Sequence, residues 1–240
     1  MKYPFRSHIL PRFTIIAGIL GLLLRIWLFA AEDDKGLLPA NHFAGVMLYI
    51  LSAAVLLVLF LSTRKLTPRR VSKQFIRLNT TYSCLLGGLG LALNAAFKLS
   101  SSAVRLAGLA TIASLAGTVV MVVMAFFCFT RKRIPYIFPA FISIVMSLET
   151  IAQCQVWGAE PQVPVYFFPL LASVFLILTA YCNTLLAARQ PTANRLAFFS
   201  QSALYFSIVS LNSSQWMLYL CMAFWAASQI YPCTRFKKKV

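Results

Sequence analysis

Two charged residues stand inside long apolar stretches of the chain, and charge pairing or the binding of a polar ligand is the chemistry that they could support. Arg25 lies near the end of the stretch 12–30, and Glu149 lies within the stretch 135–157. A charged side chain costs a few kcal/mol inside a bilayer, so such residues pair with one another or line a functional site. At about 1.5 Å per helical residue, Arg25 lies about 8 Å from the outer end of its stretch, and Glu149 lies at a comparable depth. We therefore predict an Arg25–Glu149 pair.

Further polar residues share helical faces with small residues or with this pair. The shared faces are Gly18, Gly21 and Arg25 in one stretch, and Ser83, Gly87, Gly90, Asn94 and Lys98 in another. Gln153 follows Glu149 one helical turn later, which places both side chains on one face. Small residues mark close contact between membrane helices, so these polar groups are expected to face protein or a cavity. Arg25, Asn94, Lys98, Glu149 and Gln153 form a candidate ligand-binding pocket that opens to the outside.

Two interpretations of this cluster stay open at the level of sequence. In the first, the cluster binds a solute, and the excess of Arg25 and Lys98 over Glu149 favours an anionic or zwitterionic one. In the second, the polar residues satisfy one another and fix the register of the helices, as buried polar networks do in some proteins.

The elements that must position these residues are membrane-spanning helices. Of the 240 residues, 60% are hydrophobic and 11% are charged, and the apolar residues fall in blocks of about 20, the length that a helix needs to cross a bilayer. We predict an all-α, polytopic transmembrane bundle of about eight spans that forms a single integral membrane domain over residues 1–240. The predicted spans are 12–30, 43–62, 80–99, 106–129, 135–157, 165–187, 196–212 and 215–233.

The net charge of +17 is a topology signal. Most Lys and Arg residues fall in every second loop, and four of the five acidic residues fall in or near the other loops, which predicts that both termini are cytoplasmic. A nucleic-acid-binding protein would instead spread its basic residues over a polar surface, so nucleic acid is not an expected partner. The seventh span carries several serines and Gln201, and it must be shielded by other helices or lie partly at the interface.

The basic segment 63–79 is the other distinctive feature. Val71, Phe75 and Leu78 could form the apolar side of a short helix that carries basic residues and lies on anionic headgroups. The same segment could instead dock a cytoplasmic protein partner.

Signatures of catalysis are missing from the sequence. It contains no HExxH, GxSxG or P-loop motif, and its six cysteines have no CxxC spacing, so we predict neither an enzyme nor a metal or cofactor. Pro139 and Pro169 fall within predicted spans, where each removes a backbone hydrogen bond.

Arg25-Ile-Trp27, followed by Asp33-Asp34-Lys35-Gly36-Leu37-Leu38-Pro39, resembles the N-terminal part of a group of uncharacterised bacterial multi-spanning membrane proteins. The resemblance implies a bacterial inner-membrane setting and adds no catalytic residue. Two functional hypotheses follow from the whole sequence: a small-solute transporter or membrane-embedded substrate-binding subunit, and a non-transporting scaffold or regulatory subunit of another complex.

Overall fold

The structure, a computed structural model, describes residues 9–31, 42–64, 70–71, 73–100, 105–130, 132–157, 163–231 and 235–236. These residues form an all-helical bundle, which confirms the predicted fold class. The helices are α1 (Ile9–Ala30), α2 (Phe43–Arg64), α3 (Lys73–Ser100), α4 (Arg105–Phe129), α5 (Ile137–Trp157), α6 (Val163–Ala187), α7 (Ala193–Val209) and α8 (Trp216–Ser228). A 3-10 turn, η1 (Ser210–Asn212), follows α7.

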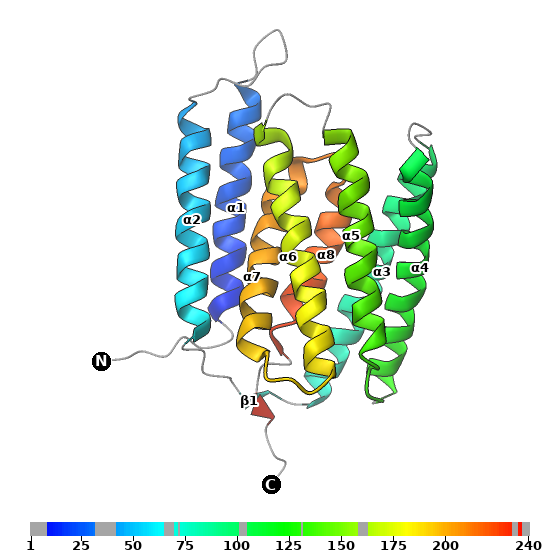
Figure 1. The fold of residues 1–240 in the computed structure, drawn as a ribbon. Coiled ribbons are helices and arrows are strands. Elements are labelled where there is room, and N and C mark those ends of the chain that lie inside the picture. Colours follow the sequence, from blue (N-terminus) through cyan, green and yellow to red (C-terminus); the bar gives the residue numbers. More distant parts are fainter. Residues whose placement is uncertain are drawn as a thin grey trace, which may run out of the picture.

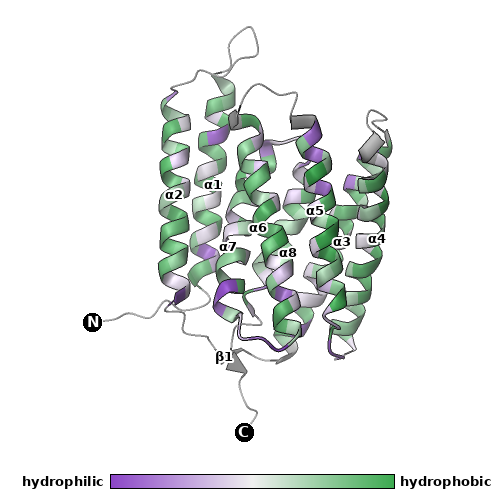
Figure 2. Ribbon diagram, in the orientation of Figure 1, coloured by the Kyte–Doolittle hydropathy of each residue, from purple (hydrophilic) through white to green (hydrophobic). Residues whose placement is uncertain are grey.

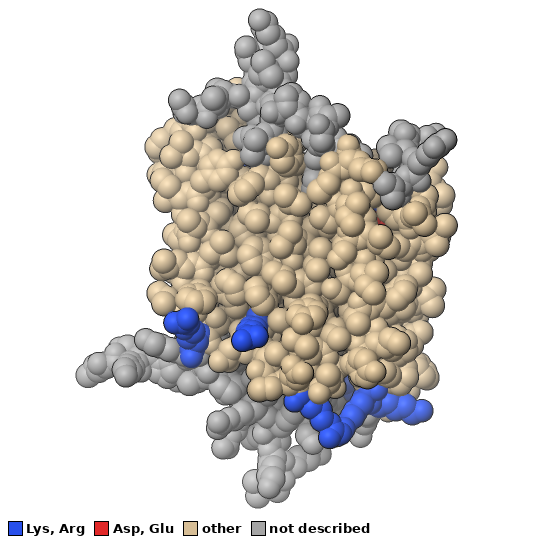
Figure 3. Space-filling view, viewed as in Figure 1, with Lys and Arg blue, Asp and Glu red and all other residues tan. Residues whose placement is uncertain are grey.

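Successive helices run in opposite directions, so α1 begins and α8 ends at the same end of the bundle (Figure 1). The basic side chains visible in the space-filling view gather at that end (Figure 3). The exposed basic residues of the described segments include Arg12, Arg64, Lys132, Arg133, Arg189 and Arg195. By the positive-inside rule this is the predicted cytoplasmic end, and we call the opposite end the outer end.

Six of the helices, α1 to α6, are long and apolar enough to cross a membrane. The remaining two, α7 and α8, have only 17 and 13 residues. α7 packs against α1, α2, α6 and α8, and its residues from Ser200 to Ser207 are all buried. The requirement that other helices shield the polar seventh helix is therefore confirmed. Because protein surrounds α7, its polar side chains are separated from lipid.

The outside of the bundle is apolar. Large hydrophobic side chains are exposed on most helices, as at Ile16, Leu57 and Val119, where the exposed fractions are 62%, 61% and 63%. Figure 2 shows hydrophobic residues along the full length of the outer helices, with hydrophilic ones concentrated near the helix ends and at a few positions inside the bundle. A surface of this extent is suited to lipid contact and not to water.

The glycine faces predicted from sequence lie where two helix pairs approach closely. A Cβ atom added at Gly21 of α1 would lie 2.8 Å from Cγ2 of Val209 on α7. One added at Gly90 of α3 would lie 2.5 Å from Cβ of Cys221 on α8. Glycine thus permits α1 to pack on α7 and α3 to pack on α8, as small residues do in membrane helices.

The segment 63–79 does not form a separate surface helix. α2 continues to Arg64, and α3 already begins at Lys73, so Phe75 and Leu78 belong to the first turns of α3. Between these helices a short strand, β1 (Arg70–Val71), pairs in parallel with β2 (Arg235–Phe236). Residues 65–69 and 72 lie outside the described segments. The pairing joins two basic parts of the sequence at one end of the bundle.

Candidate functional site

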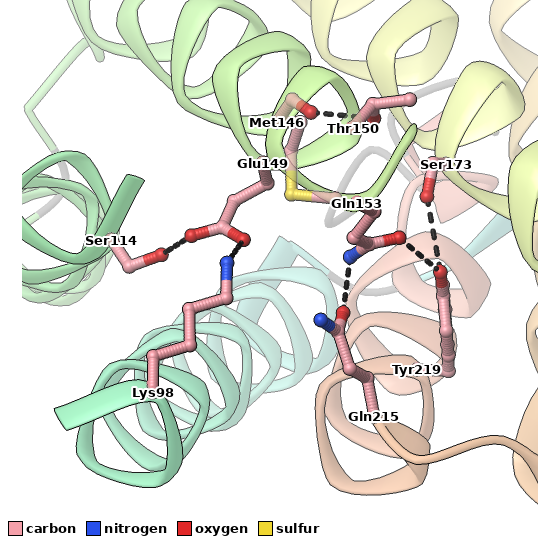
Figure 4. Close-up of polar contacts among 9 residues, drawn as sticks. All are labelled: Lys98, Ser114, Met146, Glu149, Thr150, Gln153, Ser173, Gln215 and Tyr219. Atoms are coloured by element: carbon pink, nitrogen blue, oxygen red, sulfur yellow. Dashed lines mark hydrogen bonds and ion pairs between the residues drawn. The ribbon is translucent and has the colours of Figure 1, made fainter. Parts of the chain in front are cut away.

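The carboxylate of Glu149 on α5 is held by side chains from two other helices. Lys98 on α3 donates to its Oε2 atom, and Ser114 on α4 donates to its Oε1 atom (Figure 4). The Glu149 side chain is 1% exposed and that of Lys98 is 12% exposed. Glu149 and Lys98 thus form a buried ion pair in the outer half of the bundle.

Gln153, one turn further along α5, joins α5 to α8. Its Nε2 atom donates to the side-chain oxygen of Gln215, just before α8, and its Oε1 atom accepts from the Tyr219 hydroxyl at 3.1 Å. The Tyr219 hydroxyl also lies 3.2 Å from the hydroxyl of Ser173 on α6. Figure 4 shows these side chains from α3, α4, α5, α6 and α8 pointing toward one another. We call Lys98, Ser114, Glu149, Gln153, Gln215 and Tyr219 the outer cluster.

The predicted Arg25–Glu149 pair is wrong. Arg25 is 1% exposed, but its guanidinium group binds backbone carbonyls: Nη1 donates to Val209 at 3.0 Å and Nη2 donates to Val165 at 2.9 Å. Glu149 has other partners on α3 and α4, as described above. The prediction rested on the similar depth of the two residues in the membrane, but the sequence does not show which helices are neighbours. In the structure α1 packs on α7 and α2.

Arg25 binds one carbonyl inside α6 and one at the end of α7. Pro169 has no N–H, so the carbonyl four residues before it, that of Val165, is left free inside α6. Val209 is the last residue of α7 and directly precedes the 3-10 turn η1, so its carbonyl lies where the two helical segments meet. The guanidinium carbon also lies 5.8 Å from the centre of the Phe168 ring. Arg25 therefore joins α1, α6 and α7 through fixed backbone atoms.

Asn94 on α3 is 4% exposed, and its Nδ2 atom has no hydrogen-bond partner within the described segments. The height of Asn94 along the bundle axis can be worked out from Gly117 on α4, where α3, α4 and α5 meet. A Cβ atom added there would lie 3.0 Å from Cγ1 of Val145 on α5 and 3.1 Å from Cδ1 of Leu91 on α3. About one turn further toward the outer end come Asn94 on α3, Ser114 on α4 and Glu149 on α5. Asn94 thus lies at the level of the Glu149 carboxylate.

Sequence reasoning missed Ser114, Gln215 and Tyr219 in the outer cluster. Single serines and tyrosines within apolar stretches are too common to stand out, and Gln215 was assigned to the edge of a span. The free carbonyl of Val165 can be predicted from the sequence, because Pro169 follows it by four residues and has no N–H to donate. The structure thus combines Lys98, Glu149 and Gln153 of the predicted pocket, places Asn94 at the level of Glu149 and gives Arg25 backbone partners instead of Glu149.

A second polar group joins α3, α6 and α8 near the predicted cytoplasmic end. Ser83 donates to the Ser228 hydroxyl at 2.7 Å, and Asn183 donates to the side-chain oxygen of Gln229 at 2.8 Å. Between this group and the outer cluster, α8 presents buried apolar residues such as Met222 and Trp225. Along α8 the two polar groups are therefore separated by apolar residues.

Fold and site together define a multi-pass α-helical membrane protein with a buried, charged cluster in its outer half. The comparisons do not narrow this class, since no protein family, no curated protein and no solved structure matches the chain. The bacterial setting inferred from the first segment therefore stays a prediction, and residues 32–41, which carry most of that resemblance, lie outside the described segments. Among the described residues, no three His, Cys, Asp or Glu side chains group together to hold a metal ion.

Proposed function

We propose that the protein is a small-solute transporter, or the membrane-embedded substrate-binding subunit of one, and that the outer cluster binds the solute. The observation that carries the proposal is the Lys98–Glu149 ion pair, which lies inside helices that are long and apolar enough to cross a membrane. Charged side chains inside a membrane are costly, and where they occur they commonly mark a substrate or ion pathway. The proposal includes no catalytic step and no cofactor.

The bonding pattern separates exchangeable contacts from fixed ones. The bonds of Glu149 and Gln153 run to other side chains, so a solute can replace one partner without breaking a helix. The bonds of Arg25 run to backbone carbonyls, and the Val165 carbonyl has lost its helical partner to Pro169. We therefore assign solute binding to the outer cluster and a structural role to Arg25.

A thermal-shift measurement tests the proposal. The full chain is purified in detergent, and its melting temperature is measured with millimolar amino acids, carboxylates, phosphate, amines and sugars. A bound solute at 100 times its dissociation constant stabilises the folded state by about 2.7 kcal/mol, which raises the melting temperature by several degrees. The shift should disappear in Glu149→Gln and persist in Lys132→Met, which changes an exposed residue outside the cluster. A solute shift of equal size in Glu149→Gln would contradict the proposal.

The second candidate is a scaffold or regulatory subunit. It is favoured by the fact that both oxygens of Glu149 and both amide atoms of Gln153 already have partners within the chain. In that case the basic segment 63–79, joined to β2 through β1, is where a cytoplasmic protein would dock. Co-purification of a stoichiometric partner, together with no response to any solute, would decide for this candidate.

The orientation proposed with either function places the start of α1 and the end of α8 in the cytoplasm of a bacterial cell. Single cysteines at Lys132 and Ser214, in a chain whose six native cysteines are changed to serine, test it in whole cells. A membrane-impermeant maleimide should label Ser214→Cys, in the loop before α8, and leave Lys132→Cys unlabelled until the cells are opened. The reverse pattern would overturn the orientation.

A further inference from the structure

The charge balance of the outer cluster differs from the balance expected from sequence. Counting Arg25 with Lys98 gave the predicted pocket an excess of positive charge, which favoured anions as well as zwitterions. The structure gives Arg25 partners other than the Glu149 carboxylate, because its two terminal nitrogens bind the Val165 and Val209 carbonyls. One positive group, Lys98, then faces one negative group, Glu149.

This balance discriminates between classes of solute. A simple anion that binds Lys98 displaces Glu149 and leaves a buried carboxylate without its cation, which is strongly unfavourable. A simple cation that binds Glu149 takes the carboxylate away from Lys98. A zwitterion supplies a partner to both residues at once, so the number of paired buried charges does not fall.

Asn94 supplies the second observation, which is independent of the ion pair. Its Nδ2 donor is buried and has no partner within the described segments, although a donor in this position costs free energy when it stays unpaired. It lies at the level of Glu149 and one helical turn before Lys98 on the same face of α3. A carboxylate that accepts from Lys98 can therefore accept from Asn94 as well.

We propose that the outer cluster is a binding site for a small zwitterion with an amino and a carboxylate group, as in an α-amino acid. The ligand carboxylate accepts from Lys98 Nζ and Asn94 Nδ2, and the ligand ammonium donates to the Glu149 carboxylate. Lys98 is the more exposed member of the pair, so it meets the ligand first. This assignment rests on the proposed solute-binding function and specifies its substrate class.

Matched sets of compounds test the assignment on the full chain in detergent at neutral pH. Each set contains an amino acid, its deaminated acid and its decarboxylated amine: glycine with acetate and methylamine, alanine with propionate and ethylamine, and leucine with 4-methylpentanoate and isopentylamine. The remaining common amino acids complete the panel. At least one amino acid should raise the melting temperature by several degrees, while its acid and amine, separately or mixed, should not.

The outcomes separate this inference from the function on which it rests. If an acid alone raises the melting temperature as much as its amino acid, the zwitterion assignment is overturned and solute binding stands. The zwitterion assignment is also overturned, and solute binding stands, if only phosphate or sugars raise the melting temperature. If no compound of any class acts, both the assignment and the proposed function fail.

Two asparagine variants provide a test that does not depend on loss of folding. Asn94→Leu removes a donor that has no partner in the described segments, so the melting temperature without ligand should be retained, and the amino-acid response should fall at least tenfold in apparent affinity. Asn183→Leu breaks the bond to Gln229, so it should lower the melting temperature and keep the amino-acid response. If Asn94→Leu keeps the response, or melts as early as Asn183→Leu, the role given to Asn94 is overturned.

Discussion

Arg25 on α1 supplies the hydrogen bond that Pro169 removes from α6. The proline has no N–H for the Val165 carbonyl, and the guanidinium donates to that carbonyl at 2.9 Å. An arginine and a proline, each unfavourable in an isolated membrane helix, therefore compensate each other across two helices. Each residue explains why the other is tolerated.

The first prediction concerns this relationship. Arg25→Met leaves the Val165 carbonyl without a partner in a buried place and removes one hydrogen bond from the Val209 carbonyl, so it should lower the free energy of unfolding by about 2–4 kcal/mol. In a Pro169→Ala background the restored N–H bonds Val165, and the cost of Arg25→Met should shrink by about 1 kcal/mol. The free energy of unfolding is measured by reversible unfolding in mixed detergent micelles for the unchanged protein, Arg25→Met, Pro169→Ala and the double variant. Equal costs in both backgrounds would show that Arg25 does not act through Val165.

The second prediction concerns the ion pair. Lys98→Met leaves the buried Glu149 carboxylate without its cation and should cost about 3–5 kcal/mol, whereas adding Glu149→Leu should recover most of that loss. In the double variant Ser114 can return its hydroxyl bond to its own helix. The same unfolding measurement applies, with Lys132→Met as a neutral control. A double variant less stable than either single one would mean that the two residues do not act as a pair.

The fold class and the close helix contacts could be predicted because they depend on local patterns. Apolar blocks set the helices, and the spacing of Gly87 and Gly90 marked the face of α3 that packs on α8. The partner of each charge could not be predicted in the same way. Depth along a span can be read from the sequence, but the neighbours of α1 and α5 depend on how all the helices pack, so Arg25 and Glu149 were wrongly paired.

The third prediction tests the close contact between α3 and α8. Gly90→Ala adds a Cβ atom 2.5 Å from Cβ of Cys221, so the helices must move apart, at a cost of about 1–3 kcal/mol. Gly45→Ala on α2 is the matched control, because its nearest neighbour, Cδ1 of Leu28, lies at 3.6 Å. This control should be neutral or slightly stabilising, since alanine is the better helix former. Similar melting temperatures for the two variants would contradict the packing.

The fourth prediction concerns Gln201, which is fully buried on α7 and has neither amide atom hydrogen-bonded within the described segments. An unpaired buried amide costs about 1–3 kcal/mol, so Gln201→Met should raise the melting temperature in detergent. Gln229→Met is the matched control, because the Gln229 amide accepts from Asn183 and donates to the Trp225 carbonyl, and its loss should lower the melting temperature.

The comparison of these two glutamines also bears on transport. If Gln201→Met destabilises the protein as much as Gln229→Met does, the Gln201 amide has a partner from outside the described chain, such as water. Water next to Gln201 would extend a polar path into α7, at the centre of the bundle and away from the outer cluster. If Gln201→Met stabilises the protein, the Gln201 amide has no such partner and α7 is dry at this point.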